Sequence, residues 1–513
     1  MALAKLTTFA LAGIEAELVE AEVDASSTGL PMVVLVGMAE TAVKESVPRV
    51  ERALLNSGYQ KPSSRVVINL APGDLRKDAA AFDLPIALGL LAATQQLPPD
   101  VFGGTAVAGE LALDGSTRPV KGALAMAMSA RKAGCVRLLL PEANAAEAAV
   151  VDELDVYPVS SLAEAVGILT GRLEREPFAL DVAKLFERRT QFALDFADVR
   201  GQEAAKRALL IAAAGQHNVL LIGSPGTGKT MLAKRLPTIL PPLSLAESLE
   251  TTRVYSALGK TSAGQPLHVQ RPFRSPHHTS SEAGLIGGGS NPQPGEISLA
   301  HHGVLFLDEF PEFARRTLEV LRQPLEEGSI TITRAMSKVT FPAQILLVAA
   351  MNPCPCGYLT DPKRDCRCTP IAVERYLAKI SGPLLDRIDL QLEVPSVPFE
   401  ELRRGASGTD SAALRLQVET ARARQRERFA ADPTMLNGRM NGRQIRQHCA
   451  LDTSSEQLLK MAIEETGLSI RAHDRILRVA RTIADLAGSA AVREDHLAEA
   501  IQLRSLDRKI WNR

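Results

Sequence analysis

Residues 223–230 have the residue types and spacing of a phosphate-binding loop. The loop reads Gly223-Ser-Pro-Gly-Thr-Gly-Lys-Thr, with the apolar run Asn218-Val-Leu-Leu-Ile before it and a helical pattern after it. A strand, a glycine-rich loop and a helix in this order direct backbone N–H groups at phosphate. Lys229 would reach the β and γ phosphates, and Thr230 would ligate Mg²⁺. The predicted nucleotide contacts are Gly223, Ser224, Pro225, Gly226, Thr227, Gly228, Lys229 and Thr230.

Two further apolar runs end in polar residues that suit ATP hydrolysis. Gly303-Val-Leu-Phe-Leu is followed by Asp308, which would hold Mg²⁺ through water, and Glu309, which would polarise the attacking water. The run after Gln344 ends at Asn352, an amide suited to orient water against the γ phosphate. The plainer alternatives are a solvated acidic turn after a buried strand and, at Asn352, the start of a turn.

Four of the six cysteines lie within 15 residues, at Cys354, Cys356, Cys366 and Cys368. Two Cys-x-Cys pairs that close one short loop are suited to a tetrahedral thiolate site for Zn²⁺, although Cys-x-Cys is tighter than the usual zinc-finger spacing. Structural zinc, a reduced loop without metal and a redox switch are the three interpretations left open. Bound zinc would leave the basic side chains of 363, 364 and 367 on the surface.

The composition limits the cellular setting and the partners. Lysine plus arginine and aspartate plus glutamate each number 59 among 513 residues, so no overall charge favours nucleic acid or a membrane. The longest apolar run, 84–93, is far shorter than the about 20 residues that a membrane helix needs. We expect a cytoplasmic protein with no membrane partner.

The chain is expected to be an α/β protein with three domains. Residues 1–175 alternate short apolar runs with amphipathic helical patterns, and the charged stretch 172–189 is a linker. Residues 176–395 contain the phosphate loop and its strands. Residues 396–513 are almost entirely helical in pattern, with predicted helices at 412–430, 454–466, 470–487 and 493–504.

A donor-rich segment lies before the Asp-Glu strand. It begins Arg271-Pro-Phe-Arg-Ser-Pro-His-His and leads to three glycines from Gly287. We expect an irregular, mobile insert. His277 and His278 are weak candidates for metal ligands, because the sequence offers them no matching partners nearby.

Together, the phosphate loop, the Asp-Glu strand, the Asn352 strand and the helical C-terminal region resemble the AAA+ superfamily over about residues 195–505. The resemblance implies a P-loop parallel-sheet core with a helical lid. It places Gly201 and Gln202 near the adenine and makes Asn352 the sensor on the third strand. ATP and Mg²⁺ are the cofactors that it implies.

The same resemblance assigns arginines at the subunit boundary. The segment Gly382-Pro-Leu-Leu-Asp-Arg-Ile-Asp is similar to the one that presents an arginine finger, which makes Arg387 the candidate. A local ion pair with Asp386 or Asp389 is the alternative. Arg471 resembles the second sensor of the lid, and Arg475 is its rival.

Residues 328–342 form two alternating runs around a basic turn, which predicts a hairpin with Arg334 and Lys338 near its tip. A hairpin before the third strand resembles the AAA+ clade of magnesium chelatase and the replicative helicases of archaea and eukaryotes. There it projects into the pore of a ring, so a basic tip would suit a polyanion. The alternative is an ordinary solvated turn.

The N-terminal region is similar to the Lon-type protease domain at Gly109-Glu-Leu-Ala-Leu-Asp-Gly-Ser-Thr-Arg-Pro-Val-Lys-Gly and at Lys77-Asp-Ala-Ala-Ala. The nucleophilic serine and its lysine base would fall at Ala81 and Met126. Neither replacement can attack a peptide or accept a proton, so peptidase chemistry is not expected. The domain is interpreted as a binding or ring-forming module.

An inactive Lon-like domain, a magnesium-chelatase-like ATPase and a helical C-terminal domain together resemble the bacterial ComM/YifB family over essentially the whole chain. Met351-Asn-Pro-Cys-Pro-Cys-Gly fits that family closely. The resemblance implies a homohexameric helicase that drives branch migration of DNA in recombination and natural transformation. A chelatase motor subunit and a protein-remodelling chaperone are the alternatives. The absence of an acidic integrin-like segment opposes the first, and the lack of a pore aromatic opposes the second.

Overall fold

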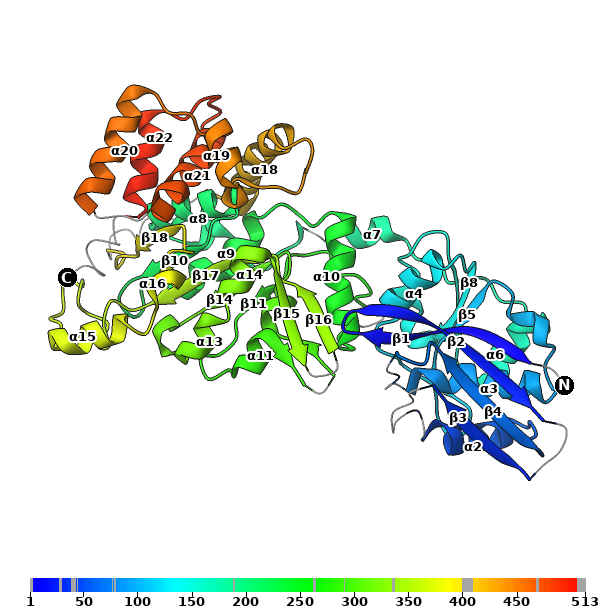
Figure 1. Ribbon diagram of the computed structural model, residues 1–513. Coiled ribbons are helices and arrows are strands. Elements are labelled where there is room, and N and C mark those ends of the chain that lie inside the picture. Colours follow the sequence, from blue (N-terminus) through cyan, green and yellow to red (C-terminus); the bar gives the residue numbers. More distant parts are fainter. Residues whose placement is uncertain are drawn as a thin grey trace.

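The computed structural model describes residues 3–26, 30–37, 43, 45–75, 77, 80–187, 190–261, 264–289, 291–334, 337–398, 409–466 and 470–504. Figure 1 shows an N-terminal lobe, a central lobe built on a parallel sheet, and a cluster of C-terminal helices on the side of the central lobe away from the N-terminus.

The N-terminal lobe is a mixed sheet with helices packed against it. The sheet has seven strands in the order β3-β4-β2-β1-β5-β8-β9. Its helix α2 buries Val50 and Leu54, as the spacing of the apolar residues predicts. The strands of this lobe are β1 (Ala4–Ala12), β2 (Glu15–Ala25), β3 (Met32–Val36), β4 (Arg65–Ala71), β5 (Thr105–Val107), β6 (Glu110–Leu111), β7 (Thr117–Arg118), β8 (Arg137–Pro141) and β9 (Asp155–Val159). Its helices are α2 (Ser46–Asn56), α3 (Asp83–Ala93), α4 (Ala123–Lys132), α5 (Glu142–Ala148) and α6 (Leu162–Leu169), and α7 (Val182–Glu187) lies in the predicted linker.

The central lobe is a five-stranded sheet in the order β11-β14-β17-β10-β18, with every neighbouring pair parallel. Strands buried on both faces read as continuous apolar runs, which is why these segments have no alternation. The sheet strands are β10 (Val219–Ile222), β11 (Phe273–Arg274), β14 (Val304–Leu307), β17 (Leu346–Met351) and β18 (Leu390–Glu393). The helices of this lobe are α8 (Glu203–Gly215), α9 (Lys229–Ile239), α10 (Leu245–Ala257), α11 (Glu282–Ile286), α12 (Glu296–Leu299), α13 (Arg315–Glu319), α14 (Arg322–Glu327), α15 (Pro370–Leu377) and α16 (Gly382–Leu385).

Two small hairpins complete the lobe. Strands β12 (Gly287–Gly288) and β13 (Gln293–Pro294) form one, and β15 (Ser329–Arg334) and β16 (Ser337–Pro342) form the other, which confirms the hairpin predicted at 328–342. The expectation of an irregular segment after Arg271 is wrong in part, because β11 joins the main sheet beside β14. Arg271 donates to the carbonyls of Pro241 and His302 at 2.6 and 2.8 Å, so these hydrogen bonds hold the segment in place.

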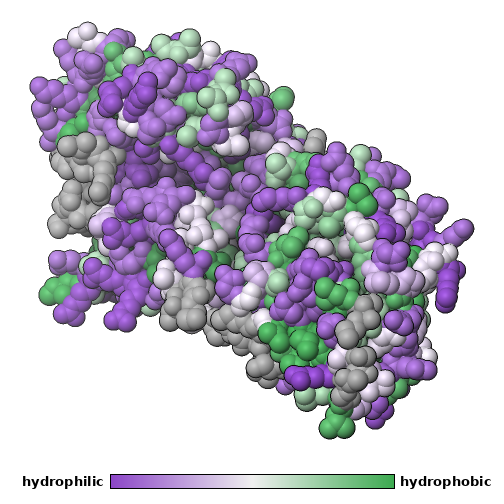
Figure 2. Space-filling model, turned by 45° about the vertical axis from the view of Figure 1, so that its right-hand side comes forward, coloured by the Kyte–Doolittle hydropathy of each residue, from purple (hydrophilic) through white to green (hydrophobic). Residues whose placement is uncertain are grey.

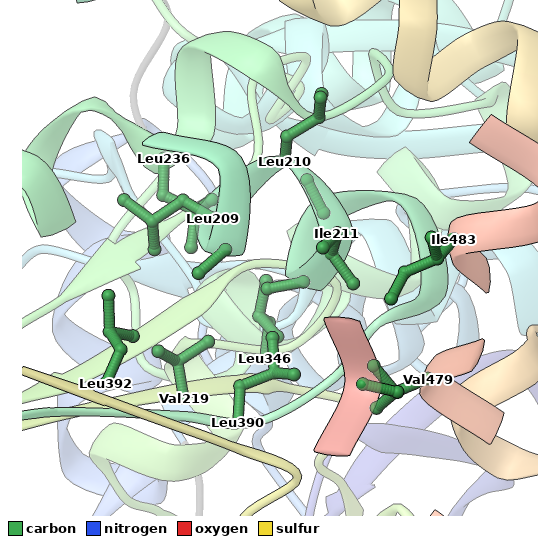
Figure 3. Packing of buried hydrophobic residues seen from close by; sticks show 14 of the residues in the cluster. Leu209, Leu210, Ile211, Val219, Leu236, Leu346, Leu390, Leu392, Val479 and Ile483 are labelled. Atoms are coloured by element: carbon green, nitrogen blue, oxygen red, sulfur yellow. The ribbon is translucent and has the colours of Figure 1, made fainter. Parts of the chain in front are cut away.

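The C-terminal helices are α18 (Ser411–Arg428), α19 (Gly442–His448), α20 (Thr453–Thr466), α21 (Ile470–Leu486) and α22 (Glu494–Gln502). Four of them coincide with the predicted helices to within about two residues, which is the usual uncertainty of helix ends. Figure 3 shows Val479 and Ile483 of α21 beside Ile211 of α8. These helices therefore share one hydrophobic core with the central sheet.

Two of the contacts between the N-terminal lobe and the central lobe involve Glu147 and Ile14. The buried Glu147 carboxylate accepts from the hydroxyls of Ser256 and Thr261, at the end of α10 and just after it. At the tip of the β1–β2 turn, Ile14 is 3% exposed and packs in the cluster that holds the apolar side chains of the β15–β16 hairpin. Figure 1 shows this turn reaching toward the hairpin.

On the face shown in Figure 2, most of the surface is hydrophilic and apolar residues gather on the N-terminal lobe. The edge strand β3 contributes to this exposure, with Met32 53% and Val36 48% exposed. Among the described residues, no helix combines the length and the apolar character needed to cross a membrane. The predicted fold class is confirmed: an α/β N-terminal lobe, a parallel-sheet core and a helical C-terminal region.

Candidate active site

The phosphate loop joins the carboxyl end of β10 to the first turn of α9. Gly226 and Gly228 have φ of +81° and +91°, which glycine adopts without the steric cost that a side chain would add. These two residues let the chain double back so that the helix α9 begins at Lys229. The N-terminal end of a helix, with its unpaired N–H groups, favours a phosphate.

Lys229 is held within the loop by three oxygen acceptors. Its Nζ lies 2.6 Å from the carbonyl oxygen of Gly223, 3.0 Å from that of Ser224 and 3.2 Å from Oδ1 of Asn352. Burial lowers the pKa of Lys229, and the nearby Asp308 carboxylate opposes this shift. Lys229 and Asn352, 123 residues apart in sequence, thus lie together at the carboxyl ends of the sheet strands.

Thr230 and Asp308 form the candidate magnesium site. The Thr230 hydroxyl donates to Oδ2 of Asp308 at 2.7 Å, and the backbone N–H of Glu309 donates to Oδ1 at 2.9 Å. A hydroxyl and a carboxylate are hard oxygen donors, which Mg²⁺ prefers. The residues present therefore fit the metal, which would supply positive charge to neutralise the phosphates of a bound nucleotide.

Glu309, the predicted residue for activating water, contacts His278. Its Oε2 lies 2.9 Å from Nδ1 of His278, and its own φ of +52° turns the side chain out of the line of β14. Sequence reasoning treated His278 only as a weak metal ligand and missed this contact. No local pattern indicated the contact, because it depends on Phe273–Arg274, a two-residue strand that pairs with β14, which ends two residues before Glu309.

His278→Ala is expected to lower ATP turnover by roughly tenfold with little change in ATP affinity, because Glu309 would lose the side chain that orients it. Steady-state turnover and nucleotide binding would be measured separately. His277→Ala is the matched control, since the ring of His277 contacts that of His278 at 4.1 Å between centroids but is not paired with Glu309. Unchanged turnover in His278→Ala would contradict this role.

Gln202 contacts both the phosphate loop and the segment that follows β18. Its Nε2 donates to the carbonyls of Thr227 at 3.2 Å and Pro395 at 2.6 Å. Gly201 and Gln202 both have positive φ, 61° and 60°, so the chain turns sharply before α8. These contacts put both residues beside the phosphate loop, and their position near the adenine stays a prediction.

Arg387 lies at the amino-terminal ends of the sheet strands, opposite the ends that carry the phosphate loop. Its backbone carbonyl accepts from Nδ2 of Asn218, which precedes β10, whereas Gly223 follows β10. At about 3.3 Å per residue, the length of β10 separates these two ends of the sheet by roughly 16 Å. The Arg387 side chain is 7% exposed and pairs with Glu326, a partner that the sequence did not indicate.

Arg475 lies at the same end of the strands as Arg387. Its guanidinium pairs with Asp389, the buried residue just before β18. Arg471 is one turn earlier in α21, and its side chain lies outside the described residues. Arg475 therefore does not face the phosphate loop of its own chain, and the second-sensor role of Arg471 stays a prediction.

The predicted DNA-binding hairpin is only partly described. Lys338 is exposed on β16, opposite Thr333 of β15. The side chain of Arg334 and residues 335 and 336 at the tip lie outside the described residues. The described part of the hairpin therefore offers one basic side chain to solvent near its tip.

The four clustered cysteines converge. Their sulfur atoms all lie within 4.8 Å of one another, and Cys354 is buried while the other three are half-buried. The Sγ of Cys354 is 3.4 Å from that of Cys356 and 3.7 Å from that of Cys366. A disulfide needs about 2.05 Å between sulfurs, so the cysteines are free thiols.

A second group, Glu250 with His301 and His302, also has its polar atoms close together. The backbone N–H of Gln344 donates to Nδ1 of His301 at 3.0 Å, so this nitrogen keeps its lone pair. The proton of the neutral ring then lies on Nε2, which faces Glu250 at 3.3 Å. This group is accounted for by hydrogen bonds, without a metal.

In the N-terminal lobe, Ala81 and Met126 are 4% and 1% exposed and pack in the same hydrophobic cluster. The positions that would carry a peptidase nucleophile and base are therefore filled with apolar atoms. This packing agrees with the interpretation of the lobe as a module without peptidase chemistry.

Comparison with known proteins gives matches along nearly the whole chain. Residues 195–402 match the family model described as magnesium chelatase, subunit ChlI, residues 19–144 match subunit ChlI of Mg-chelatase, and residues 408–504 match the ChlI C-terminal model. The chain is 45% identical over 511 residues to the uncharacterized protein YifB of Salmonella typhimurium, covering 99% of this chain and 98% of the relative. It is 44% identical over 513 residues to the competence protein ComM of Haemophilus influenzae, covering 99% and 98%.

A more distant similarity covers part of the chain. The zygotic DNA replication licensing factor mcm6-B of Xenopus laevis is 26% identical over 210 residues, which cover 38% of this chain and 22% of the relative.

Proposed function

The chain belongs to the ComM/YifB family of magnesium-chelatase-like AAA+ ATPases, and on that premise we propose that it is an ATP-driven DNA motor that drives branch migration in homologous recombination and natural transformation. The proposal of ATP hydrolysis rests on two contacts at the carboxyl ends of the sheet strands. Lys229 contacts Asn352, and Thr230 contacts Asp308. The printed name of the Haemophilus relative, a competence protein, supports the link to transformation.

The proposed reaction uses each of these groups once. Lys229 and the loop N–H groups bind the phosphates, and Thr230 with Asp308 hold Mg²⁺. Glu309 polarises the attacking water, and Asn352 orients it. Arg387, from a neighbouring subunit, completes the site, because roughly 16 Å separate it from the phosphate loop of its own chain. Hydrolysis therefore depends on assembly, which we propose to be a homohexamer.

DNA is the proposed load. The β15–β16 hairpin carries Lys338 near its tip, and a basic group in the pore of a ring can track the phosphate backbone. The similarity to a DNA replication licensing factor supports this choice. The motor would act in the cytoplasm with ATP and Mg²⁺, and Zn²⁺ is proposed for the four clustered sulfurs.

Branched DNA is expected to accelerate ATP hydrolysis, and Lys338→Glu is expected to remove most of this acceleration while basal turnover stays within about twofold. The reason is the loss of a phosphate contact, which also reduces the slope of log affinity against log salt by about 0.9 per contact on duplex DNA. Hydrolysis with a three-stranded junction, and migration of that junction, would be measured over a salt series.

The matched control is Lys132→Glu, an equal change of charge at an exposed residue that ends α4 in the N-terminal lobe. If branched DNA neither binds nor stimulates the unaltered protein, the DNA proposal is wrong. The matching family models carry the name of a magnesium chelatase subunit. Metal insertion into a tetrapyrrole with added partner subunits would then favour the chelatase alternative, and stimulation by unfolded protein would favour a remodelling chaperone.

A further inference from the structure

The segment from Pro353 to Thr369, here called the cysteine loop, connects the end of β17 to α15 in the central lobe. It begins immediately after Asn352 and ends at the N-cap of α15, where the Thr369 side chain accepts from the backbone N–H of Ala372. The two Cys-x-Cys pairs lie at its two ends. Whatever fixes the four sulfurs therefore fixes both ends of the loop.

The sulfur positions match one metal ion. A tetrahedral Zn²⁺ with Zn–S bonds of about 2.3 Å places its sulfurs about 3.8 Å apart. The sulfur–sulfur distances are 3.4 Å for Cys354–Cys356, 3.7 Å for Cys354–Cys366 and 3.6 Å for Cys356–Cys366. The backbone N–H of Cys356 points at the sulfur of Cys368 at 3.4 Å, as for a thiolate ligand.

The middle of the loop is organised by its own polar contacts. Arg364 donates to the Tyr358 hydroxyl at 2.8 Å and lies over the same ring at 5.0 Å. The backbone N–H of Lys363 donates to the Asp361 carboxylate at 2.8 Å. The loop has little apolar side-chain burial beyond Cys354, so its closure depends on the cysteine ends.

The loop packs directly on the phosphate loop. Gly357 has a φ of +85°, and a Cβ added there would lie 2.6 Å from Cδ of Pro225, so the ring of Pro225 packs directly on the Gly357 backbone. The Ser224 hydroxyl hydrogen-bonds the Asp361 carboxylate. Pro225 and Ser224 both belong to the proposed phosphate-binding residues, and the loop therefore forms part of their support.

We propose that Cys354, Cys356, Cys366 and Cys368 bind one Zn²⁺ that braces the cysteine loop against the phosphate loop, so that zinc occupancy sets the affinity for nucleotide. The four thiols lose their protons to become ligands, and no electrons are transferred. This inference rests on the proposed nucleotide site and is independent of the proposed DNA load.

The full-length protein, purified without chelators, is expected to contain one zinc per chain by elemental analysis. Replacing zinc by Co²⁺ should produce thiolate-to-cobalt charge-transfer absorption. Cys366→Ser should lose the metal and weaken binding of a fluorescent ATP analogue by about tenfold, as for the loss of one good hydrogen bond at the site. Cys135→Ser, at a free cysteine far from the loop, is the matched control.

Two further measurements separate a brace from a general folding defect. Asp361→Ala should keep the zinc, because Asp361 is not one of the four ligands, and still weaken nucleotide binding, because it removes the carboxylate that contacts Ser224 and accepts from the backbone N–H of Lys363. Reversible removal of zinc from the unaltered protein should weaken binding, and zinc addition should restore it, with the helical circular dichroism unchanged.

Absence of zinc and of a cobalt signal would overturn the metal site. Equal nucleotide affinity with and without zinc would overturn the brace. A zinc-loaded protein that binds no ATP would instead overturn the proposed nucleotide function.

Discussion

Glu309→Gln is expected to leave ATP bound and to lower turnover by about a hundredfold to ten-thousandfold. Glutamine fills the same space but cannot accept a proton from the attacking water. The phosphates, Lys229 and the Thr230–Asp308 pair would be unaffected, because Glu309 contacts Asp308 only through its backbone N–H. Turnover by phosphate release and affinity by a fluorescent ATP analogue would be measured on the same preparation.

Lys229→Ala is the matched comparison, since it should lose binding as well as turnover. A Glu309→Gln protein that hydrolyses ATP at the normal rate would show that another group activates the water. A Glu309→Gln protein that no longer binds ATP would show that Glu309 contributes to binding.

Arg387→Ala is expected to reduce turnover by about a thousandfold or more while ATP affinity changes little. Its charge would stabilise the transferring phosphoryl group only in the transition state. The ion pair with Glu326, whose side chain is 57% exposed, and a hydrogen bond to the carbonyl of Pro383 hold Arg387 in the isolated chain. Glu326→Ala should preserve turnover in the assembled state, since it removes the paired carboxylate but leaves the guanidinium in place.

Mixing variants tests whether the arginine acts on a neighbour. Lys229→Ala and Arg387→Ala are each inactive, but a ring assembled from equal amounts of both should regain about a quarter of the wild-type turnover. Half of the subunits keep Lys229, and half of their neighbours supply Arg387 across the heterologous interface. Lys229→Ala mixed with Glu309→Gln is the control and should regain nothing, because both defects lie in the same subunit's half of the site. No recovery in the first mixture would contradict action in trans.

The phosphate loop and the strands around it were predictable because their signals are local. A glycine pattern between an apolar strand and a helix specifies its own geometry, and the carboxyl ends of parallel strands share one edge. Asp308 and Asn352 therefore had to meet Lys229 and Thr230 once the strands were parallel. The C-terminal helices were found for a similar reason, the helical spacing of their apolar residues.

Contacts between distant segments were not predictable from these patterns. His278 meets Glu309 because the two-residue strand β11 joins the sheet beside β14, and two residues are too few to show a period. Glu326 was missed as the partner of Arg387 because the two are 61 residues apart and belong to different elements. In each case tertiary packing determines which residues are in contact, and a local sequence pattern does not report on tertiary packing.

The docking of Ile14 limits where this chain can be divided. A protein cut in the linker near residue 175 would keep the whole ATPase core but would lose Ile14, which packs in the same hydrophobic cluster as Ile330, Ile332 and Phe341 of the hairpin. Those apolar atoms would then be exposed to water next to the hairpin tip, which is proposed to contact DNA. The shortest autonomous unit of this molecule therefore includes its first hairpin, although that hairpin lies almost two hundred residues before the phosphate loop.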